Sequence, residues 1–330
     1  MRRREFITRL GGAAVAAPVL WPFSTRAQQA MPVIGFLHSG SPEPNAVRIA
    51  GFRKGLGAAG VVEGENVRIE FRWALGRNDR LPDMAADLIR RRVAVITTPA
   101  SVPAALAAKA ATTDIPIVFA VASDPVALGL VASLNRPGGN ITGIATLNAE
   151  LAAKRLGLLR DLLPQAARFT VLVNSNNALA DAFVKDLQVG ASPLGINPEI
   201  VNASTEPELD AAFANVAKKP GGVLIVGTDS YFYIRRGQIA ALAARYALPT
   251  IYDNRDYAEA GGLVSYGPDV VSAFEQAGGY TGRILKGEKP ANLPVAQSTK
   301  FETVINLKAA KALGLEIPAK LLFTADEVIE

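Results

Sequence analysis

Short apolar runs alternate with amphipathic segments along most of this chain, and this alternation happens in two successive series. The first series covers residues 33–146 and the second covers 151–313. Runs that are apolar almost throughout are typical of buried parallel strands, and apolar residues at helical spacing predict the helices between them. The 330-residue length exceeds that of one typical core. The sequence therefore predicts an α/β chain of two doubly wound, Rossmann-like lobes with parallel sheets and a cleft between the lobes.

The expected elements can be placed from this periodicity. We expect strands at 33–37, 67–73, 94–97, 115–121, 141–146, 170–173, 199–201, 223–226, 250–252 and 263–265. We expect helices at 45–59, 81–91, 103–111, 127–134, 151–163, 179–189, 206–217, 235–246, 270–285 and 307–313.

Residues 1–27 have the pattern of a cleaved export signal. Three consecutive arginines precede an apolar stretch at 10–23, which ends in small residues up to Ala27. The pair Arg3-Arg4 also resembles a twin-arginine signal, although general secretion stays open. We expect cleavage after Ala27 and a periplasmic location, with an uncleaved anchor as the alternative.

The high isoelectric point originates largely in this leader. The formal net charge is +5, and residues 1–26 contain five arginines and one glutamate, so the remainder carries about +1. A mature chain with so little excess positive charge lacks the basic surface of nucleic-acid-binding proteins. We therefore expect no nucleic-acid partner.

Cysteine and histidine are too scarce for several kinds of chemistry. The chain has no cysteine and one histidine, His38. Disulfides and thiolate sites are excluded, and a histidine-based catalytic triad or multi-histidine metal site is not expected. A literal G-x-G-x-x-G match at Gly55, Gly57 and Gly60 closes a predicted helix and does not follow a strand, so it lacks the dinucleotide-binding context. We expect no cofactor and a helix-capping role for Gly60.

Polar residues follow the predicted strands, where open parallel sheets bind their ligands. The candidate ligand-binding residues are Ser39, Ser41, Thr98, Ser101, Ser123, Asp124, Asn174, Asn176, Thr228, Asp229, Asp253, Asn254 and Tyr266. Hydroxyl, amide and carboxylate groups suit hydrogen bonding to a polar ligand, and Asp229 or Asp253 suits a ligand ammonium. Helix capping selects the same residue types, so a structural role remains the alternative for each.

Several longer stretches resemble a known family. Residues 124–131, 135–143, 258–267, 300–308 and 325–330 are similar to the ABC-transporter substrate-binding proteins of the tryptophan/tyrosine-binding type. The resemblance implies a type I periplasmic-binding fold with three crossings between lobes, a small amino-acid-like and often aromatic ligand in the cleft, and no catalysis.

The resemblance also shapes the expected organisation and partners. We expect an N-terminal lobe of 31–147 plus 266–290 and a C-terminal lobe of 148–265 plus 291–330. The predicted protein is a monomer that captures an amino acid or related carboxylate by hinge closure and delivers it to an inner-membrane ABC permease. Two alternatives stay open, namely an exported sensor that presents its ligand to a membrane receptor and an exported enzyme.

Overall fold

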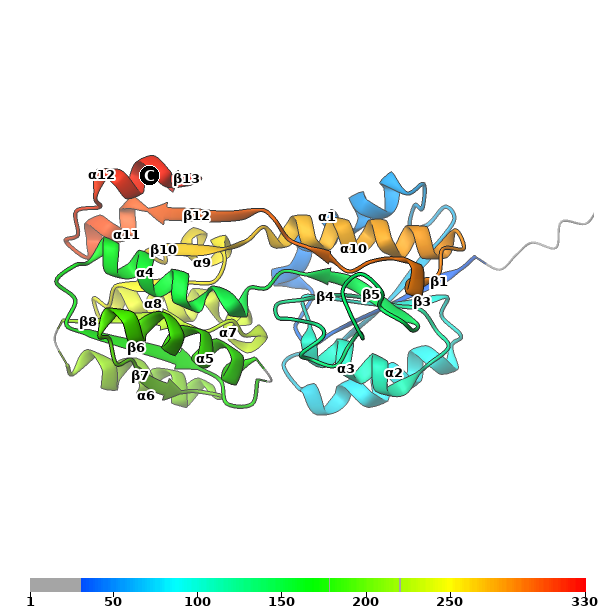
Figure 1. Ribbon diagram of the computed structural model, residues 1–330, viewed down its shortest axis with the longest axis horizontal. Helices are drawn as coiled ribbons and strands as arrows, with labels where there is room; N and C mark the ends of the chain where they lie inside the picture. Colours follow the sequence, from blue (N-terminus) through cyan, green and yellow to red (C-terminus); the bar gives the residue numbers. More distant parts are fainter. Residues whose placement is uncertain (1–30, 178, 220) are drawn as a thin grey trace, which may run out of the picture. The chain divides into compact units, whose positions relative to one another are not determined.

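The computed structural model describes residues 31–330 apart from 178 and 220, and its strands form two sheets (Figure 1). The predicted signal at 1–27 and the cut after Ala27 lie outside the described residues. We call each sheet with the helices packed on it a lobe. The predicted class, two doubly wound α/β lobes, is confirmed.

The sheet of the first lobe has six strands, all of them paired in parallel. They are β1 (Val33–His38), β2 (Arg68–Trp73), β3 (Val95–Pro99), β4 (Ile117–Val121), β5 (Ile141–Ala145) and β11 (Ala296–Gln297). Their order is β11-β5-β4-β3-β1-β2. The helices of this lobe are α1 (Ala46–Ala58), α2 (Leu81–Arg90), α3 (Val102–Ala111) and α10 (Val270–Leu285).

The sheet of the second lobe has seven strands. They are β6 (Arg168–Val173), β7 (Glu199–Asn202), β8 (Gly222–Val226), β9 (Thr250–Tyr252), β10 (Val264–Pro268), β12 (Phe301–Asn306) and β13 (Glu327–Ile329). Their order is β13-β12-β10-β9-β8-β6-β7, and the β10–β12 pair is antiparallel. The antiparallel pair and the strand at 301–306 differ from the prediction, which has parallel sheets and no strand at 301–306.

The helices of the second lobe are more numerous and several are short. They are α4 (Ala152–Leu162), α5 (Ala180–Ala191), α6 (Glu206–Ala217), α7 (Ser230–Ile234), α8 (Arg236–Arg245), α9 (Arg255–Glu259), α11 (Leu307–Ala312) and α12 (Ala319–Thr324).

Each sheet is covered on both faces because successive strand residues point to opposite sides. On β3, Val95 packs into the cluster beneath α1 and α10, whereas the next residue, Ile96, packs into the cluster beneath α2 and α3. On β8, Leu224 and Ile225 divide in the same way between two clusters. This two-sided burial explains why the strands read as continuous apolar runs.

The chain passes between the lobes three times, in agreement with the number that the resemblance implies. The passages follow β5, β10 and β11. Two segments differ from the predicted lobe boundaries. The prediction assigned 291–330 to the second lobe, but β11 pairs with β5 of the first. It assigned 266–290 to the first lobe, but β10 continues to Pro268 in the second sheet.

One predicted helix is wrong. Residues 127–134 form turns instead of a helix. Gly129 lies in the left-handed region with φ 67°, and the N–H of Leu130 donates to the carbonyl of Pro125. A left-handed residue interrupts the repeating backbone geometry that a helix needs.

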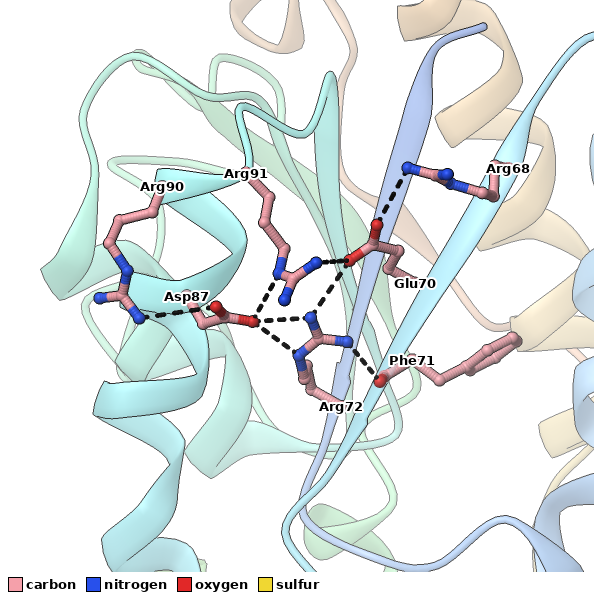
Figure 2. Close-up of polar contacts among 7 residues, drawn as sticks. All are labelled: Arg68, Glu70, Phe71, Arg72, Asp87, Arg90 and Arg91. Atoms are coloured by element: carbon pink, nitrogen blue, oxygen red, sulfur yellow. Dashed lines mark hydrogen bonds and ion pairs between the residues drawn. The ribbon is translucent and has the colours of Figure 1, made fainter.

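The edge strand β2 is tied to α2 by ion pairs. Arg72 on β2 donates to Asp87 on α2 with an Nη2–Oδ2 distance of 2.6 Å, and Arg91 reaches both Asp87 and Glu70 (Figure 2). The charges that alternate along this strand therefore form a network over its polar face. Charged side chains on an edge strand also discourage pairing with another chain.

The apparent dinucleotide motif lies where two helices of the first lobe pack together. These helices, α1 and α10, lie side by side (Figure 1). A Cβ at Gly55 would stand 1.8 Å from the backbone oxygen of Glu275 on α10, so only glycine permits this approach. Gly60 has φ 70°, its N–H donates to Gly57, and the N–H of Val61 donates to Leu56. This is a Schellman cap, as the capping prediction for Gly60 requires.

Gly55→Ala is expected to destabilise the protein by about 2–3 kcal/mol, because the added methyl group forces two packed backbones apart. Gly57→Ala is the matched control on the same helix, since a Cβ there meets nothing within 4 Å. It should be neutral or stabilise the protein by about 0.5–1 kcal/mol. Denaturant unfolding of both variants measures the difference, and equal stabilities would contradict the packing role.

Candidate ligand-binding site

The strand order identifies one switch point in each sheet. In the first lobe the chain turns back between β1 and β3, and in the second lobe it turns back between β6 and β8. Ligands of open α/β sheets bind beyond the strand ends at such points. Ser39 and Ser101 follow β1 and β3, and Asn174 and Asp229 follow β6 and β8.

A cavity of about 180 Å³ lies at these strand ends and is lined by both lobes. The predicted residues that line it are Ser39, Asn174, Asn176, Thr228, Asp229, Asp253 and Asn254. For comparison, an engineered cavity of about 150 Å³ holds benzene. The cavity therefore has room for a small organic molecule.

Three other predicted residues support the cavity wall or the sheet without lining the cavity. Ser101 caps α3 and bonds to Ser39. Thr98 is fully buried because β3 continues to Pro99, beyond the predicted end of that strand. The carbonyl of Ser41 accepts a hydrogen bond from Asn45.

The remaining three predicted residues lie away from the switch points. The Ser123 hydroxyl donates to Glu150 over 2.6 Å, and Asp124 accepts the N–H of Val126 in a turn. Tyr266 lies within β10, where its ring stacks on Phe301. The residues that these three side chains contact, Glu150, Val126 and Phe301, do not line the cavity either.

Asp229 combines helix capping with a place in the cavity. Its Oδ1 accepts the N–H of Phe232 over 2.9 Å at the start of α7, and its Oδ2 accepts from Asn174 over 3.3 Å. Burial raises the pKa of Asp229, and the hydrogen bonds from Phe232 and Asn174 only partly oppose this. Asp229 can therefore cap α7 and contact a ligand with the same side chain.

Asp253 ends a buried chain of polar side chains. The guanidinium of Arg155 donates to the backbone and side-chain oxygens of Asn148 and to the carbonyl of Tyr266. This fixes the Asn148 amide so that its Nδ2 donates to Asp253 over 3.0 Å. Asn254 donates to the other carboxylate oxygen. Burial raises the pKa of Asp253, with Arg155 opposing the shift.

These two carboxylates share a feature that bears on the ligand. In the described part of the chain, neither Asp229 nor Asp253 lies within ion-pair distance of a basic side chain; their partners are amides and a backbone N–H. A buried carboxylate is strongly stabilised by a paired cation. The second lobe thus presents two acceptors suited to a cationic group.

The lobes also touch each other directly beside the cavity. Arg48 on α1 forms an ion pair with Asp256 on α9 over 2.6 Å, and its guanidinium lies 3.7 Å from the ring centroid of Tyr233 on α7. The Tyr233 hydroxyl lies 2.7 Å from Asp256 and 2.8 Å from the carbonyl of Pro44. These four residues form an interlobe clasp, because Pro44 and Arg48 belong to the first lobe and the other two to the second.

The candidate residues include none of the four clasp residues and only part of the cavity wall. Arg48, Asn148, Tyr231, Tyr233 and Phe274 line the cavity but were absent from the candidate residues. The candidate residues all came from the ends of predicted strands, whereas Arg48 and Phe274 lie on helices. The run of aromatic residues at 231–233, shortly after the end of β8, was an available signal for this part of the wall.

Arg48→Met is expected to weaken the binding of every ligand by the same factor, about tenfold, because it removes contacts that hold the two lobes together beside the cavity. The ratio of affinities between two ligands should not change. Titration calorimetry measures the affinities, and small-angle scattering of the unliganded protein should show a larger radius of gyration. Arg53→Met is the control on the same helix, since Arg53 pairs with Glu63 within the first lobe. Unchanged affinity and radius for Arg48→Met would contradict the clasp.

The residues that the structure describes contain neither a metal-binding cluster nor a membrane-spanning helix. No group of three or more histidine, aspartate and glutamate side chains is placed to hold a metal ion there. Over the same residues, no helix has the length and apolar character needed to cross a membrane.

The chain is similar to known binding proteins. A family model described as "ABC transporter substrate binding protein" matches residues 42–329. A protein of Clostridioides difficile (strain R20291) named "Tyrosine-binding protein" is 29% identical over 266 residues, which is 81% of this chain and 76% of the relative.

Two solved structures add information on the fold. The ABC domain from Streptococcus pneumonia in complex with L-Trp has a TM-score of 0.83 and 26% identity, covering 90% of this chain and 99% of that one. The ligand-free, open structure of CD0873 from Clostridium difficile has a TM-score of 0.65 and 27% identity, covering 91% and 99%. At nearly equal identity and coverage, the TM-score is higher with the L-Trp complex than with the ligand-free structure. The predicted type I periplasmic-binding architecture is confirmed.

Proposed function

This chain belongs to the ABC transporter substrate binding protein family, and from that premise we propose that it captures an amino acid between its lobes and delivers it to a permease. Aromatic amino acids are the first candidates. A relative is named for tyrosine, and a similar structure holds L-Trp.

The observation that carries the proposal is the pair of carboxylates in the cavity. Asp229 and Asp253 line a space between the lobes, and the hydrogen bonds described for them come from neutral donors. The ammonium of an amino acid supplies the missing cation. A neutral sugar would leave both carboxylates without a directly paired cation in a poorly solvated site.

The rest of the wall supports an apolar or aromatic side chain on the ligand. Leu179, Tyr231, Val270 and Phe274 contribute apolar and aromatic surface to the same cavity. Aromatic side chains offer a large contact area to a flat ring. A site with a few polar groups among apolar neighbours is typical of small-molecule binding.

Binding without chemical conversion is part of the proposal. His38 is the one histidine in the chain, and its Nδ1 already accepts the N–H of Gly40 over 2.8 Å. Burial, with a contribution from Arg48, lowers the pKa of His38 to about 3, so it is poorly suited to take a proton from a nucleophile. The family match and the named relatives, which are binding proteins, favour the same conclusion.

We further propose the cellular setting of this activity. Export directed by residues 1–27, with cleavage after Ala27, would place the protein in the periplasm as a monomer. Hinge closure around the ligand would create the form that a permease of the inner membrane recognises.

A thermal-shift screen tests the proposed function. The purified protein is heated with each of the common amino acids, with aromatic carboxylic acids and with small sugars. We expect one or a few aromatic amino acids to raise the melting temperature, since a ligand at a hundred times its Kd adds about 2.7 kcal/mol of stability. Shifts by sugars only, or ligand turnover detected by mass spectrometry, would contradict the proposal.

A further inference from the structure

Five arginines gather on the first lobe, at a place that does not border the cavity. They are Arg68 and Arg72 on β2, Arg90 and Arg91 at the end of α2, and Arg92 just beyond that helix. We call these five residues the arginine patch. All but Arg72 are exposed, and none of the five lines the cavity. Ligand binding between the lobes therefore does not account for the patch.

Two carboxylates, those of Glu70 and Asp87, pair with the patch in the described part of the chain. Each of them forms ion pairs with three of the five arginines, over 2.6–3.5 Å (Figure 2). Five positive and two negative charges leave this cluster with an excess of +3. Since residues 27–330 carry about +1 in all, the residues outside the cluster carry about −2. The positive charge of the mature chain is thus concentrated in this cluster.

The side chains of the patch are suited to phosphate groups. A guanidinium presents its N–H groups as a planar fork that matches two oxygens of a phosphate. Arg72 and Arg91 are held by both carboxylates. Arg68 and Arg90 have one ion pair each and are 64% and 69% exposed, so most of their N–H groups face solvent. The patch therefore combines fixed guanidiniums with open ones.

Arg92 occupies a backbone position that favours glycine. Its φ is 53°, its N–H donates to Ile89 and the N–H of Val93 donates to Leu88, so Arg92 ends α2 in the left-handed conformation. Glycine adopts this conformation freely, whereas arginine does so at a cost in stability. Its side chain is exposed. An exposed arginine at a strained position favours a role for its charge.

The chain enters the first lobe within this patch. The carbonyl of Pro32 accepts the N–H of Arg68 over 3.0 Å, and the carbonyl of Val33 accepts the N–H of Ala94, which closely follows the patch in sequence. Pro32 follows Phe23, the end of the apolar stretch in the proposed export signal, by nine positions. Nine residues span at most about 30 Å, so an uncleaved signal would keep the patch near the membrane. An anionic lipid surface is therefore the partner that this place in the chain favours.

We propose that the arginine patch binds anionic lipids of the inner membrane and holds the first lobe against the periplasmic surface. The guanidiniums donate to lipid phosphates, and the negative surface potential attracts the excess positive charge. The rest of the mature chain is slightly negative and is repelled, which orients the patch towards the membrane. This inference rests on the proposed export and not on the identity of the ligand.

A vesicle-binding experiment tests the patch. The protein that begins at Gln28 keeps every residue that the structure describes and lacks the apolar stretch of the signal. Sedimentation measures its binding to vesicles of phosphatidylcholine alone and to vesicles that also contain about 30% phosphatidylglycerol. We expect binding only to the second kind. Raising sodium chloride from about 0.05 M to about 0.5 M should release the protein, because salt screens the attraction.

A triple variant removes the outer charges of the patch. Arg68→Gln, Arg90→Gln and Arg92→Gln combined should lower this binding by at least about tenfold, while Arg72 and Arg91 stay in place. The melting temperature shows whether the variant folds, and its affinity for an amino acid should not change because the patch lies outside the cavity. Arg92→Gly alone should raise the melting temperature, since glycine accepts the left-handed conformation, and should still weaken vesicle binding.

The matched control removes three positive charges from the second lobe. Arg160→Gln, Lys218→Gln and Arg245→Gln combined replace exposed residues and should leave vesicle binding nearly unchanged. An equal loss in both triple variants would overturn the inference, as would equal binding to the two kinds of vesicle or binding to neither. Binding only to vesicles that carry inner-membrane proteins would identify a protein partner and overturn the lipid one. Each of these outcomes leaves the proposed capture of an amino acid standing.

Discussion

Asp229→Asn is expected to lower the affinity for an amino acid by at least about thirtyfold, because the ligand ammonium loses a buried counter-charge worth about 2–5 kcal/mol. Asparagine is as good a helix N-cap as aspartate, so α7 should keep its start. Titration calorimetry with L-tyrosine and L-tryptophan measures the loss.

The same substitution is expected to leave the unliganded protein at least as stable. Burial raises the pKa of Asp229 above its ordinary value of 3.8. The charged carboxylate therefore costs folding free energy at neutral pH, and the cost disappears as the pH falls through the raised pKa towards 3.8. Asparagine removes this cost, so the melting temperature at neutral pH should not fall. Asp253→Asn is a poorer test, since Asn148 and Asn254 both donate to that carboxylate.

Asp124→Asn is the matched control for Asp229→Asn. Asp124 also follows a strand, but it lies outside the cavity and accepts only the N–H of Val126 among the contacts described for its side chain. Its replacement should not change ligand affinity. Unchanged affinity in Asp229→Asn, or an equal loss in both variants, would contradict the proposed contact with the ammonium.

Arg155→Met is expected to destabilise the protein by about 3–5 kcal/mol. Arg155 is fully buried, and its guanidinium satisfies three oxygen acceptors, two on Asn148 and the carbonyl of Tyr266. Burial lowers the pKa of Arg155 to about 10, so it remains charged at neutral pH. Methionine fills part of the space but leaves buried acceptors unpaired, and each such group costs about 1–3 kcal/mol.

The same variant should also weaken ligand binding, because Arg155 fixes the amide of Asn148 that donates to Asp253. Chemical denaturation measures the stability and calorimetry the affinity. Arg160→Met on the same helix is the control, since Arg160 is exposed and lies 4.0 Å from Asp161. It should change stability by less than about 0.5 kcal/mol. A similarly small change for Arg155→Met would contradict its structural role.

Much of the fold could be predicted because strands that are buried on both faces of a sheet appear in the sequence as continuous apolar runs. The continuous apolar runs at 115–121 and 223–226 correspond to β4 and β8. The wrong helix at 127–134 had helical composition, but Gly129 adopts a left-handed conformation there. The pairing of β11 with β5 depends on contacts between distant segments, which a local pattern does not encode.

The sequence could identify candidate site residues only where they follow a predicted strand. Seven of the thirteen predicted residues line the cavity. Ser39 and Asp229 follow strands that border a switch point. Asp253 follows β9, which borders none, and still lines the cavity, whereas Ser123 follows β4 and bonds to Glu150 outside it. These positions depend on packing between distant segments, so the sequence could not separate the cases. Arg48 was missed because an arginine on an amphipathic helix usually lies in solvent.

A crystal structure of the protein grown with L-tyrosine or L-tryptophan would show directly where the ligand binds and which groups hold it. We expect one ligand in the cavity between the lobes, with its ammonium within about 3.2 Å of the carboxylate of Asp229 or Asp253. A bound amino acid outside this cavity, or one with its carboxylate towards Asp229, would contradict the proposed function.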